Sequence, residues 1–169
     1  TQSFETIMAA TRALRDIPDL TFLVVGDGTR RAWLEEQLAS GDYPNVKLLP
    51  YQPRSSVPQL YATGNLCLVP LKKGTAQDTF PSKIYTIMAA GRPVVASADP
   101  DSELADLVES AACGWHVPPD DIDALAEAIR QLLSEYNPHK PSPRHVVAFT
   151  ALAKQARALK QNEDRRWRA

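Results

Sequence analysis

Short apolar runs rich in β-branched residues alternate along this chain with longer stretches in which apolar residues recur every three or four positions. The first pattern is typical of buried strands and the second of amphipathic helices. It predicts strands at 20–25, 46–49, 66–69, 94–96 and 114–117. It predicts helices at 3–15, 30–39, 57–63, 82–90, 102–110, 123–136 and 144–166.

The alternation of strands with helices indicates the fold class. Parallel neighbours in a sheet need a crossover connection, and a helix is the usual one. The run Phe22-Leu23-Val24-Val25 is apolar at every position, as expected when helices cover both faces of a sheet. We therefore expect an α/β, Rossmann-like parallel sheet flanked by helices. Since doubly wound domains begin with a strand and this chain begins with a helical pattern, we expect a first strand upstream of residue 1.

A proline-rich stretch interrupts the pattern near the C-terminus. Three prolines lie in 137–143, where they forbid regular pairing. We predict one domain at 1–136, followed at 137–169 by a proline hinge and a C-terminal helix. The segment 144–169 holds seven basic and two acidic residues, which favours either a solvated helix face or a contact with a membrane surface or another domain.

Composition excludes several classes of protein. The chain has 169 residues, 44% hydrophobic and 23% charged, with a net charge of −1. These values exclude a disordered or fibrous protein and argue against a nucleic-acid partner. No run approaches the ~18 apolar residues that span a bilayer. The two cysteines, Cys67 and Cys113, form no disulfide or metal pattern, and we interpret both as buried free thiols in a reducing compartment.

Loops after the predicted strands hold the candidate chemistry, because ligands bind beyond the carboxyl ends of parallel strands. The turn with Gly26 and Gly28 allows close backbone approach to a ligand, although it is equally typical of an ordinary tight turn. In the next loop Tyr51 could lie beside a planar ring and Arg54 could reach a phosphate or a base edge. Serines in that loop are also explained as helix caps.

The loop between Pro70 and Lys83 is the most informative. A helix is predicted to begin near Pro81, where proline suits the first turn. The N–H groups around Phe80, Ser82 and Lys83, together with the helix dipole, would favour a phosphate. Lysines 72, 73 and 83 add positive charge. The alternative is a surface loop with solvated lysines.

The run from Phe80 to Ser97, FPSKIYTIMAAGRPVVAS, closely resembles the donor-binding signature of GT-B glycosyltransferases of family four, and in particular their colanic-acid or exopolysaccharide type. The resemblance covers about residues 4–136. Further segments agree with that family in the same order: 24–28, 45–49, 60–62, 66–70, 114–121 and 124–129.

This resemblance implies the C-terminal, nucleotide-sugar-binding half of a two-domain GT-B enzyme. Such enzymes transfer a sugar from a nucleoside-diphosphate donor to an acceptor, typically with retention, and need no divalent metal or other cofactor. The catalytic residues and most of the acceptor site belong to the N-terminal domain of the same full-length chain, so we expect no catalytic residue here and no activity of this fragment alone. The resemblance also suggests a cytoplasmic location, with peripheral contact at the inner membrane face as a further hypothesis.

The resemblance also assigns residues. The family's Glu-x7-Glu pattern falls on Asp78, toward the donor sugar, and on Thr86, where a threonine replaces the acid that binds the ribose. The diphosphate is expected at the backbone of Thr79, Phe80, Pro81 and Ser82, with Lys83 beside it. The base is expected between Tyr51, Gln52 and Arg54, with the turn of Gly26 and Gly28 near the donor.

Two alternatives stay open. Thr86 in place of the acid would suit a degenerate GT-B module that kept the fold and lost its ligand. A nucleotide-sugar 2-epimerase half would need acids and a histidine that bridge two domains. We interpret His116 as a core or rim residue rather than a catalyst, and Glu103 as a minor candidate at the rim of the cleft.

Overall fold

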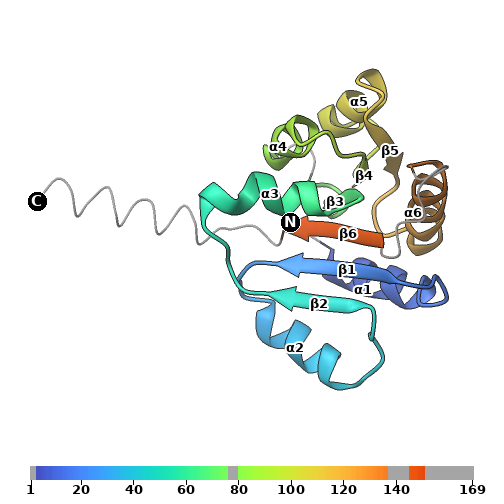
Figure 1. Cartoon of the computed structure of the whole chain (residues 1–169). Helices are drawn as coiled ribbons and strands as arrows, with labels where there is room; N and C mark the ends of the chain where they lie inside the picture. Colours follow the sequence, from blue (N-terminus) through green and yellow to red (C-terminus); the bar gives the residue numbers. More distant parts are fainter. Residues whose placement is uncertain (1–2, 76–79, 137–144, 151–169) are drawn as a thin grey trace, which may run out of the picture.

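The computed structural model describes residues 3–75, 80–136 and 145–150. Six parallel strands form one sheet in the order β2-β1-β6-β3-β4-β5 (Figure 1). The strands are β1 Leu20–Val25, β2 Val46–Leu49, β3 Leu66–Pro70, β4 Val94–Ser97, β5 Gly114–Val117 and β6 His145–Thr150. The helices are α1 Phe4–Ala13, α2 Arg31–Ala39, η1 Arg54–Ser56, α3 Val57–Thr63, α4 Lys83–Ala89, α5 Glu103–Ser110 and α6 Ile122–Tyr136.

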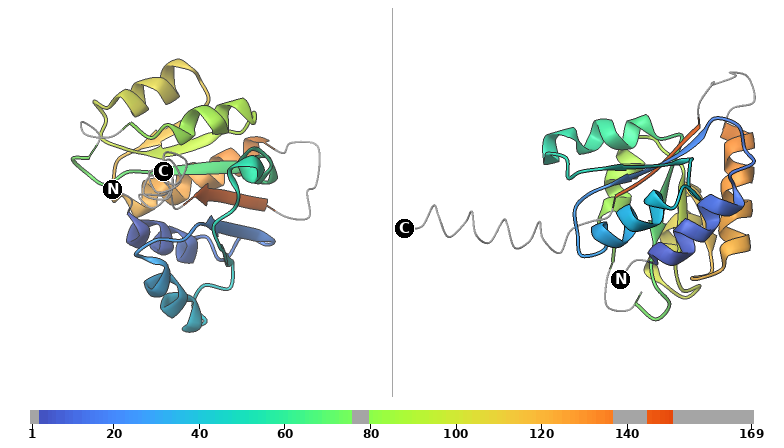
Figure 2. Two further views of the ribbon diagram at one scale, coloured as in Figure 1. Left: turned by 90° about the vertical axis from the view of Figure 1, so that its left-hand side faces the viewer. Right: turned by 90° about the horizontal axis from the view of Figure 1, so that it is seen from below.

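Helices cover both faces of the sheet, as Figures 1 and 2 show. One buried cluster packs α1, α2 and α6 against residues such as Phe22, Leu68 and Val95. A second cluster packs α3, α4 and α5 against the opposite face, which includes Cys67 and Val94. The expected α/β, Rossmann-like class is therefore confirmed, and the apolar strands are explained by burial on both sides.

The five strands and six helices predicted between residues 3 and 136 are all present, with ends that differ by at most two residues. One close approach explains a glycine at the start of β5. A Cβ on Gly114 would lie 1.9 Å from the carbonyl oxygen of Val94, so only glycine lets β5 pair with β4 there.

The helix expected from Arg144 is wrong over His145–Thr150, which forms β6. β6 pairs with β1 over six residues and with β3 at Val147 and Ala148. It thereby occupies the centre of the sheet, the position that the first strand holds in the usual doubly wound order. Val147 and Ala148 are both buried and belong to the two different core clusters, so β6 is part of the domain. The other residues of the predicted hinge and helix, 137–144 and 151–169, lie outside the described residues.

Candidate functional site

The predicted site residues follow strands that all point the same way, so the loops that hold them gather at the carboxyl edge of the sheet, on the left in Figure 1. Gly26 and Gly28 follow β1, Tyr51 and Gln52 follow β2, and Arg54 begins η1. Phe80, Pro81 and Ser82 precede α4, which contains Lys83 and Thr86. Asp78 and Thr79 lie outside the described residues.

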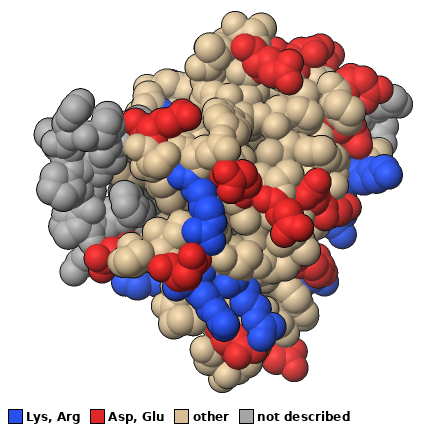
Figure 3. Space-filling model, turned by 90° about the vertical axis from the view of Figure 1, so that its right-hand side faces the viewer, with Lys and Arg blue, Asp and Glu red and all other residues tan. Residues whose placement is uncertain are grey.

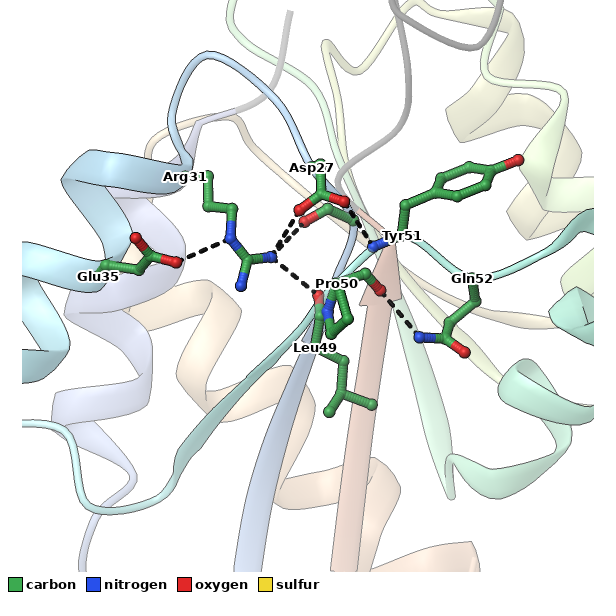
Figure 4. A network of polar contacts seen from close by, with 8 residues as sticks. Asp27, Arg31, Glu35, Leu49, Pro50, Tyr51 and Gln52 are labelled. Atoms are coloured by element: carbon green, nitrogen blue, oxygen red, sulfur yellow. Dashed lines mark hydrogen bonds and ion pairs between the residues drawn. The ribbon is translucent and has the colours of Figure 1, made fainter.

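A polar network joins the turn after β1 to the loop after β2 (Figure 4). The Asp27 carboxylate accepts a hydrogen bond from the Tyr51 backbone N–H at 2.8 Å and from Arg31 at 2.7 Å. Arg31 also donates to the carbonyl oxygens of Gly26 and Leu49, at 3.2 and 3.4 Å. The two loops are therefore held as one unit, and neither Asp27 nor Arg31 was predicted from the sequence to have a role.

This unit presents the residues expected around a base. Tyr51 is 47% exposed, and its ring points away from the Asp27 carboxylate (Figure 4). The Gln52 side-chain amide donates to the carbonyl oxygen of Pro50 at 3.0 Å. Arg54 is exposed. The structure thus leaves a ring and a guanidinium on the surface of this edge.

The loop after β3 approaches the loop after β4. The Gly74 N–H donates to the Asp99 carboxylate at 2.8 Å, and Gly74 has a φ of 73°, which favours glycine. Lys72 and Lys73 are exposed, which fits both the charge expected beside a phosphate and the alternative of solvated lysines. Further along, the rings of Phe80 and Tyr85 lie 5.6 Å apart.

α4 begins two residues later than Pro81. Ser82 is its N-cap residue, and the side chain of Ser82 makes no capping hydrogen bond. The N–H groups of Ile84 and Tyr85 donate to the carbonyl oxygens of Pro81 and Ser82 within the first turn. The helix start expected near Pro81 is confirmed to within two residues. The N–H groups of Ile84 and Tyr85 are engaged within the protein.

Lys83 differs from the expectation that it adds charge to the loop surface, because its side chain is only 9% exposed. Burial is the main cause that lowers its pKa, from 10.5 to about 8, while the Cys67 thiol opposes that shift. Burial also raises the pKa of Cys67 to about 12, against smaller opposing effects of Arg92 and Lys83. Lys83 is therefore an interior group beneath the start of α4.

The N-terminal end of α1 lies at the same edge and was missed from the sequence. Glu5 forms an ion pair with Arg30 of the turn after β1. A backbone hydrogen bond is the main cause that lowers the Glu5 pKa, and Arg30 and then Lys72 lower it further. Because Lys72 belongs to the loop after β3, the Glu5 carboxylate is under the electrostatic influence of a loop from each half of the sheet.

The carboxylate of an exposed residue, Asp120, lies at the start of α1. Asp120, in the loop after β5, accepts hydrogen bonds from Ser3 Oγ at 2.7 Å and Thr6 Oγ1 at 3.0 Å. Ser3 and Thr6 are buried, and they also contact each other at 2.6 Å. Negative charge at a helix N-terminus is stabilising, and at the N-terminus of α1 the Asp120 carboxylate supplies that charge.

Several minor predictions can be checked in the described part of the chain. The His116 ring lies 2.7 Å from the carbonyl oxygen of Ala98 through Nε2, as expected for a rim residue. Glu103 is exposed at the start of α5. Both cysteines are free, but Cys113 is only partly buried. Among residues 3–75, 80–136 and 145–150, no cluster of three His, Cys, Asp or Glu could hold a metal, and no helix has the length and apolar character to cross a membrane.

A cavity of about 440 Å³ lies near the opposite edge of the sheet, between the turns that lead into β4 and β5 and helix α6. Its lining includes Arg92, Cys113, Trp115 and Glu135, and none of the predicted site residues. Acidic and basic side chains are interspersed on the face that this side presents (Figure 3). The cavity is therefore separate from the carboxyl-edge site.

Comparisons with known proteins agree with this arrangement. The family model described as "Glycosyl transferases group 1" matches residues 2–135. Over 136 residues the chain is 35% identical to the Escherichia coli (strain K12) protein named "Putative colanic acid biosynthesis glycosyl transferase WcaI", a match that covers 78% of this chain and 32% of that protein. Over 131 residues it is 25% identical to the Pseudomonas aeruginosa protein named "Probable glycosyltransferase WbjE", with the same two shares.

A third similar protein has a different name. The chain is 32% identical over 130 residues to "Exopolysaccharide phosphotransferase SCO2592" of Streptomyces coelicolor. This match covers 76% of this chain and 13% of that protein. The chain thus spans about a third or less of the length of these relatives.

Proposed function

Since the chain belongs to the group 1 glycosyl transferases, we propose that it is the nucleotide-sugar-binding domain of an enzyme that transfers a sugar from a nucleoside diphosphate to an acceptor. One observation supports this most: the glycine turn after β1, the loop of Tyr51 after β2 and the lysine-containing loop after β3 all lie at the carboxyl edge of the sheet. Such edges are where open α/β sheets bind nucleotides.

The diphosphate would lie between the loop after β3 and the start of α4. Lys72 and Lys73 are exposed there and would supply charge. The backbone of Thr79, Phe80, Pro81 and Ser82 would hold the diphosphate, and the N–H donors would come from Thr79, Phe80 and Ser82, since proline has no backbone N–H. Buried Lys83 would act through the protein interior, where electrostatic interactions are less screened than in water.

The other parts of the donor would follow from that placement. The base would lie at Tyr51, Gln52 and Arg54, near the turn of Gly26 and Gly28. The sugar would face Asp78, and the ribose would face Thr86. A threonine hydroxyl forms weaker hydrogen bonds to ribose than a carboxylate does, so we propose modest nucleotide affinity.

The partner domain, the course of the reaction and the cellular location are proposed from membership of this family. We propose an N-terminal GT-B domain of a longer chain as the partner that supplies the catalytic residues, and transfer with retention and without a metal. The names of the relatives support a role in polysaccharide synthesis. A cytoplasmic location, with peripheral contact at the inner membrane face, is part of the same proposal.

Isothermal titration calorimetry with UDP, GDP and a sugar conjugate of each tests the proposed function. The double variant Lys72→Ala/Lys73→Ala should bind the best of these ligands about fivefold to tenfold more weakly, because charge-assisted contacts are lost. The control Lys47→Ala removes an exposed charge from the middle of β2 and should bind as the unchanged chain does. Absence of binding of all four ligands at millimolar concentration would favour the degenerate module instead.

A further inference from the structure

Asp27 connects two loops of the proposed donor site through one carboxylate. One oxygen accepts the Tyr51 backbone N–H at 2.8 Å, and the other accepts Arg31 at 2.7 Å. Asp27 follows β1 and Tyr51 follows β2, so the contact bridges 24 residues of sequence. An anchor at the Tyr51 N–H fixes the backbone from which the Tyr51 ring projects.

Arg31 and a neighbouring backbone bond keep that carboxylate in place. The Arg31 guanidinium contacts Asp27 and the carbonyl oxygen of Leu49, the last residue of β2, while its Nε donates to Glu35 at 2.8 Å. The Gly26 N–H donates to the same Leu49 carbonyl at 3.1 Å. The anchor is therefore held from both strands.

The contacts also limit how this loop can recognise a base. The Tyr51 N–H is engaged by Asp27, and the Gln52 side-chain N–H is engaged by Pro50. The Tyr51 N–H would have to leave Asp27 before it could reach a base edge, whereas the Gln52 amide has a second N–H and a carbonyl oxygen besides its contact with Pro50. The Tyr51 ring, 47% exposed and directed away from the network (Figure 4), needs no such rearrangement. Stacking on an aromatic ring accepts any base, because every base has a π-face.

We propose that Asp27 is a positioning residue that holds Tyr51 as a stacking platform for the base of the nucleoside diphosphate. This rests on the proposed function. Asp27 touches neither the base nor the diphosphate, and it acts through the Tyr51 backbone. Tyr51 binds the base through its ring and not through its hydroxyl, so UDP and GDP bind with affinities within about tenfold of each other.

Calorimetry on the chain with UDP, GDP and inorganic pyrophosphate tests this role. Asp27→Ala and Tyr51→Ala should each weaken UDP binding about tenfold, the range expected for loss of one base–ring stack, and leave pyrophosphate binding unchanged. Tyr51→Phe should bind as the unchanged chain does. Asp27→Asn keeps an acceptor for the Tyr51 N–H and should recover most of the affinity. The double variant Asp27→Ala/Tyr51→Ala should be no weaker than Tyr51→Ala, because the two residues act as one unit.

Glu35→Gln is the matched control, since it removes the outer ion pair of Arg31 and leaves Asp27 and Tyr51 joined. Hydrogen exchange should show a protected Tyr51 amide in the unchanged chain and in Glu35→Gln, and a fast one in Asp27→Ala. Unchanged UDP binding in Asp27→Ala, or an equal loss of pyrophosphate binding, would overturn the positioning role. A preference above about a hundredfold for one base would overturn the stacking mode. If the unchanged chain binds pyrophosphate but no nucleotide, the proposed function fails first, and this inference fails with it.

Discussion

Gly64 and Ala148 pack against each other where the end of α3 meets the central strand β6. A Cβ placed on Gly64 would lie 3.0 Å from the Cβ of Ala148 and 3.0 Å from the carbonyl oxygen of Leu66. Ala148 is 1% exposed, so its side chain cannot move into solvent to make room for a larger neighbour. This close fit leaves no room for a larger side chain at position 148 of β6, which the pairing with β1 and β3 holds in place.

Enlarging Ala148 should therefore destabilise the domain. We expect Ala148→Leu to lower the free energy of unfolding by about 2–3 kcal/mol, as overpacking does in well-packed cores. Urea denaturation followed by circular dichroism measures this. The control Ala39→Leu enlarges an exposed alanine at the end of α2 and should change stability by less than about 0.5 kcal/mol. Equal stability of the two variants would contradict the central position of β6.

Lys83 should give stability an unusual dependence on pH. Its pKa is lowered from 10.5 to about 8 by burial, so between these values the unfolded chain binds a proton that the folded chain does not. Stability should therefore rise with pH across that window, by up to about 3 kcal/mol relative to Lys83→Met, which has no such group. Chemical denaturation of both proteins at pH 7, 8, 9 and 10 checks this. Parallel curves for the two proteins would contradict the buried lysine.

Asp120 should contribute to stability through α1. Asp120→Ala removes two hydrogen bonds and a negative charge from the helix N-terminus, and leaves buried Ser3 and Thr6 without that partner. We expect a loss of about 1–3 kcal/mol. Asp42→Ala serves as the control, because the Asp42 side chain forms an exposed ion pair with Arg12 at 4.0 Å, a type of contact worth about 0–1 kcal/mol. Thermal unfolding should rank Asp120→Ala well below Asp42→Ala.

The two thiols should differ in reactivity. Burial raises the pKa of Cys67 to about 12, and Cys67 is fully buried. Cys113 is partly exposed, and burial raises its pKa as well. Only thiolates react rapidly, so a thiol reagent at pH 8 should modify Cys113 slowly and Cys67 only after unfolding. The variant Cys113→Ser should show no reaction in the native state. Native modification of that variant would show that β3 is accessible.

Thr86 offers a gain-of-function test of the donor site. Thr86→Glu introduces, at a half-buried position of α4, the acid that the resemblance to the family implies would bind the ribose. If the ribose lies there, UDP should bind about fivefold or more tightly, since hydrogen bonds to a charged acceptor are worth about 1.5–3 kcal/mol. Calorimetry with UDP and pyrophosphate separates this effect from a general one. Weaker UDP binding would place the ribose elsewhere.

Local patterns were sufficient for the elements between residues 3 and 136. The apolar run of β1 and the helical periods of α5 and α6 follow from which faces of each strand or helix are buried against the adjacent layer of the fold. The parallel direction of these strands was predicted from the alternation of strands and helices, whereas their order in the sheet was not. The carboxyl-edge location of Tyr51 and Phe80 followed from the same rule, without knowledge of a single distance.

The structure alone decided the state of β6, the burial of Lys83 and the partners of Asp27. The period of Val146, Phe149 and Leu152 favours a helix, but the backbone groups of β1 and β3 need partners, and a strand between them supplies both sets of hydrogen bonds. Likewise, the burial of Lys83 and the hydrogen-bond partners of Asp27 depend on which distant segments pack beside them. The periodicity of apolar residues depends on neighbours in the sequence, so the sequence by itself predicts where helices and strands lie. Strand pairing and side-chain burial depend on segments that are distant in sequence, so they are determined only when the whole sheet has formed.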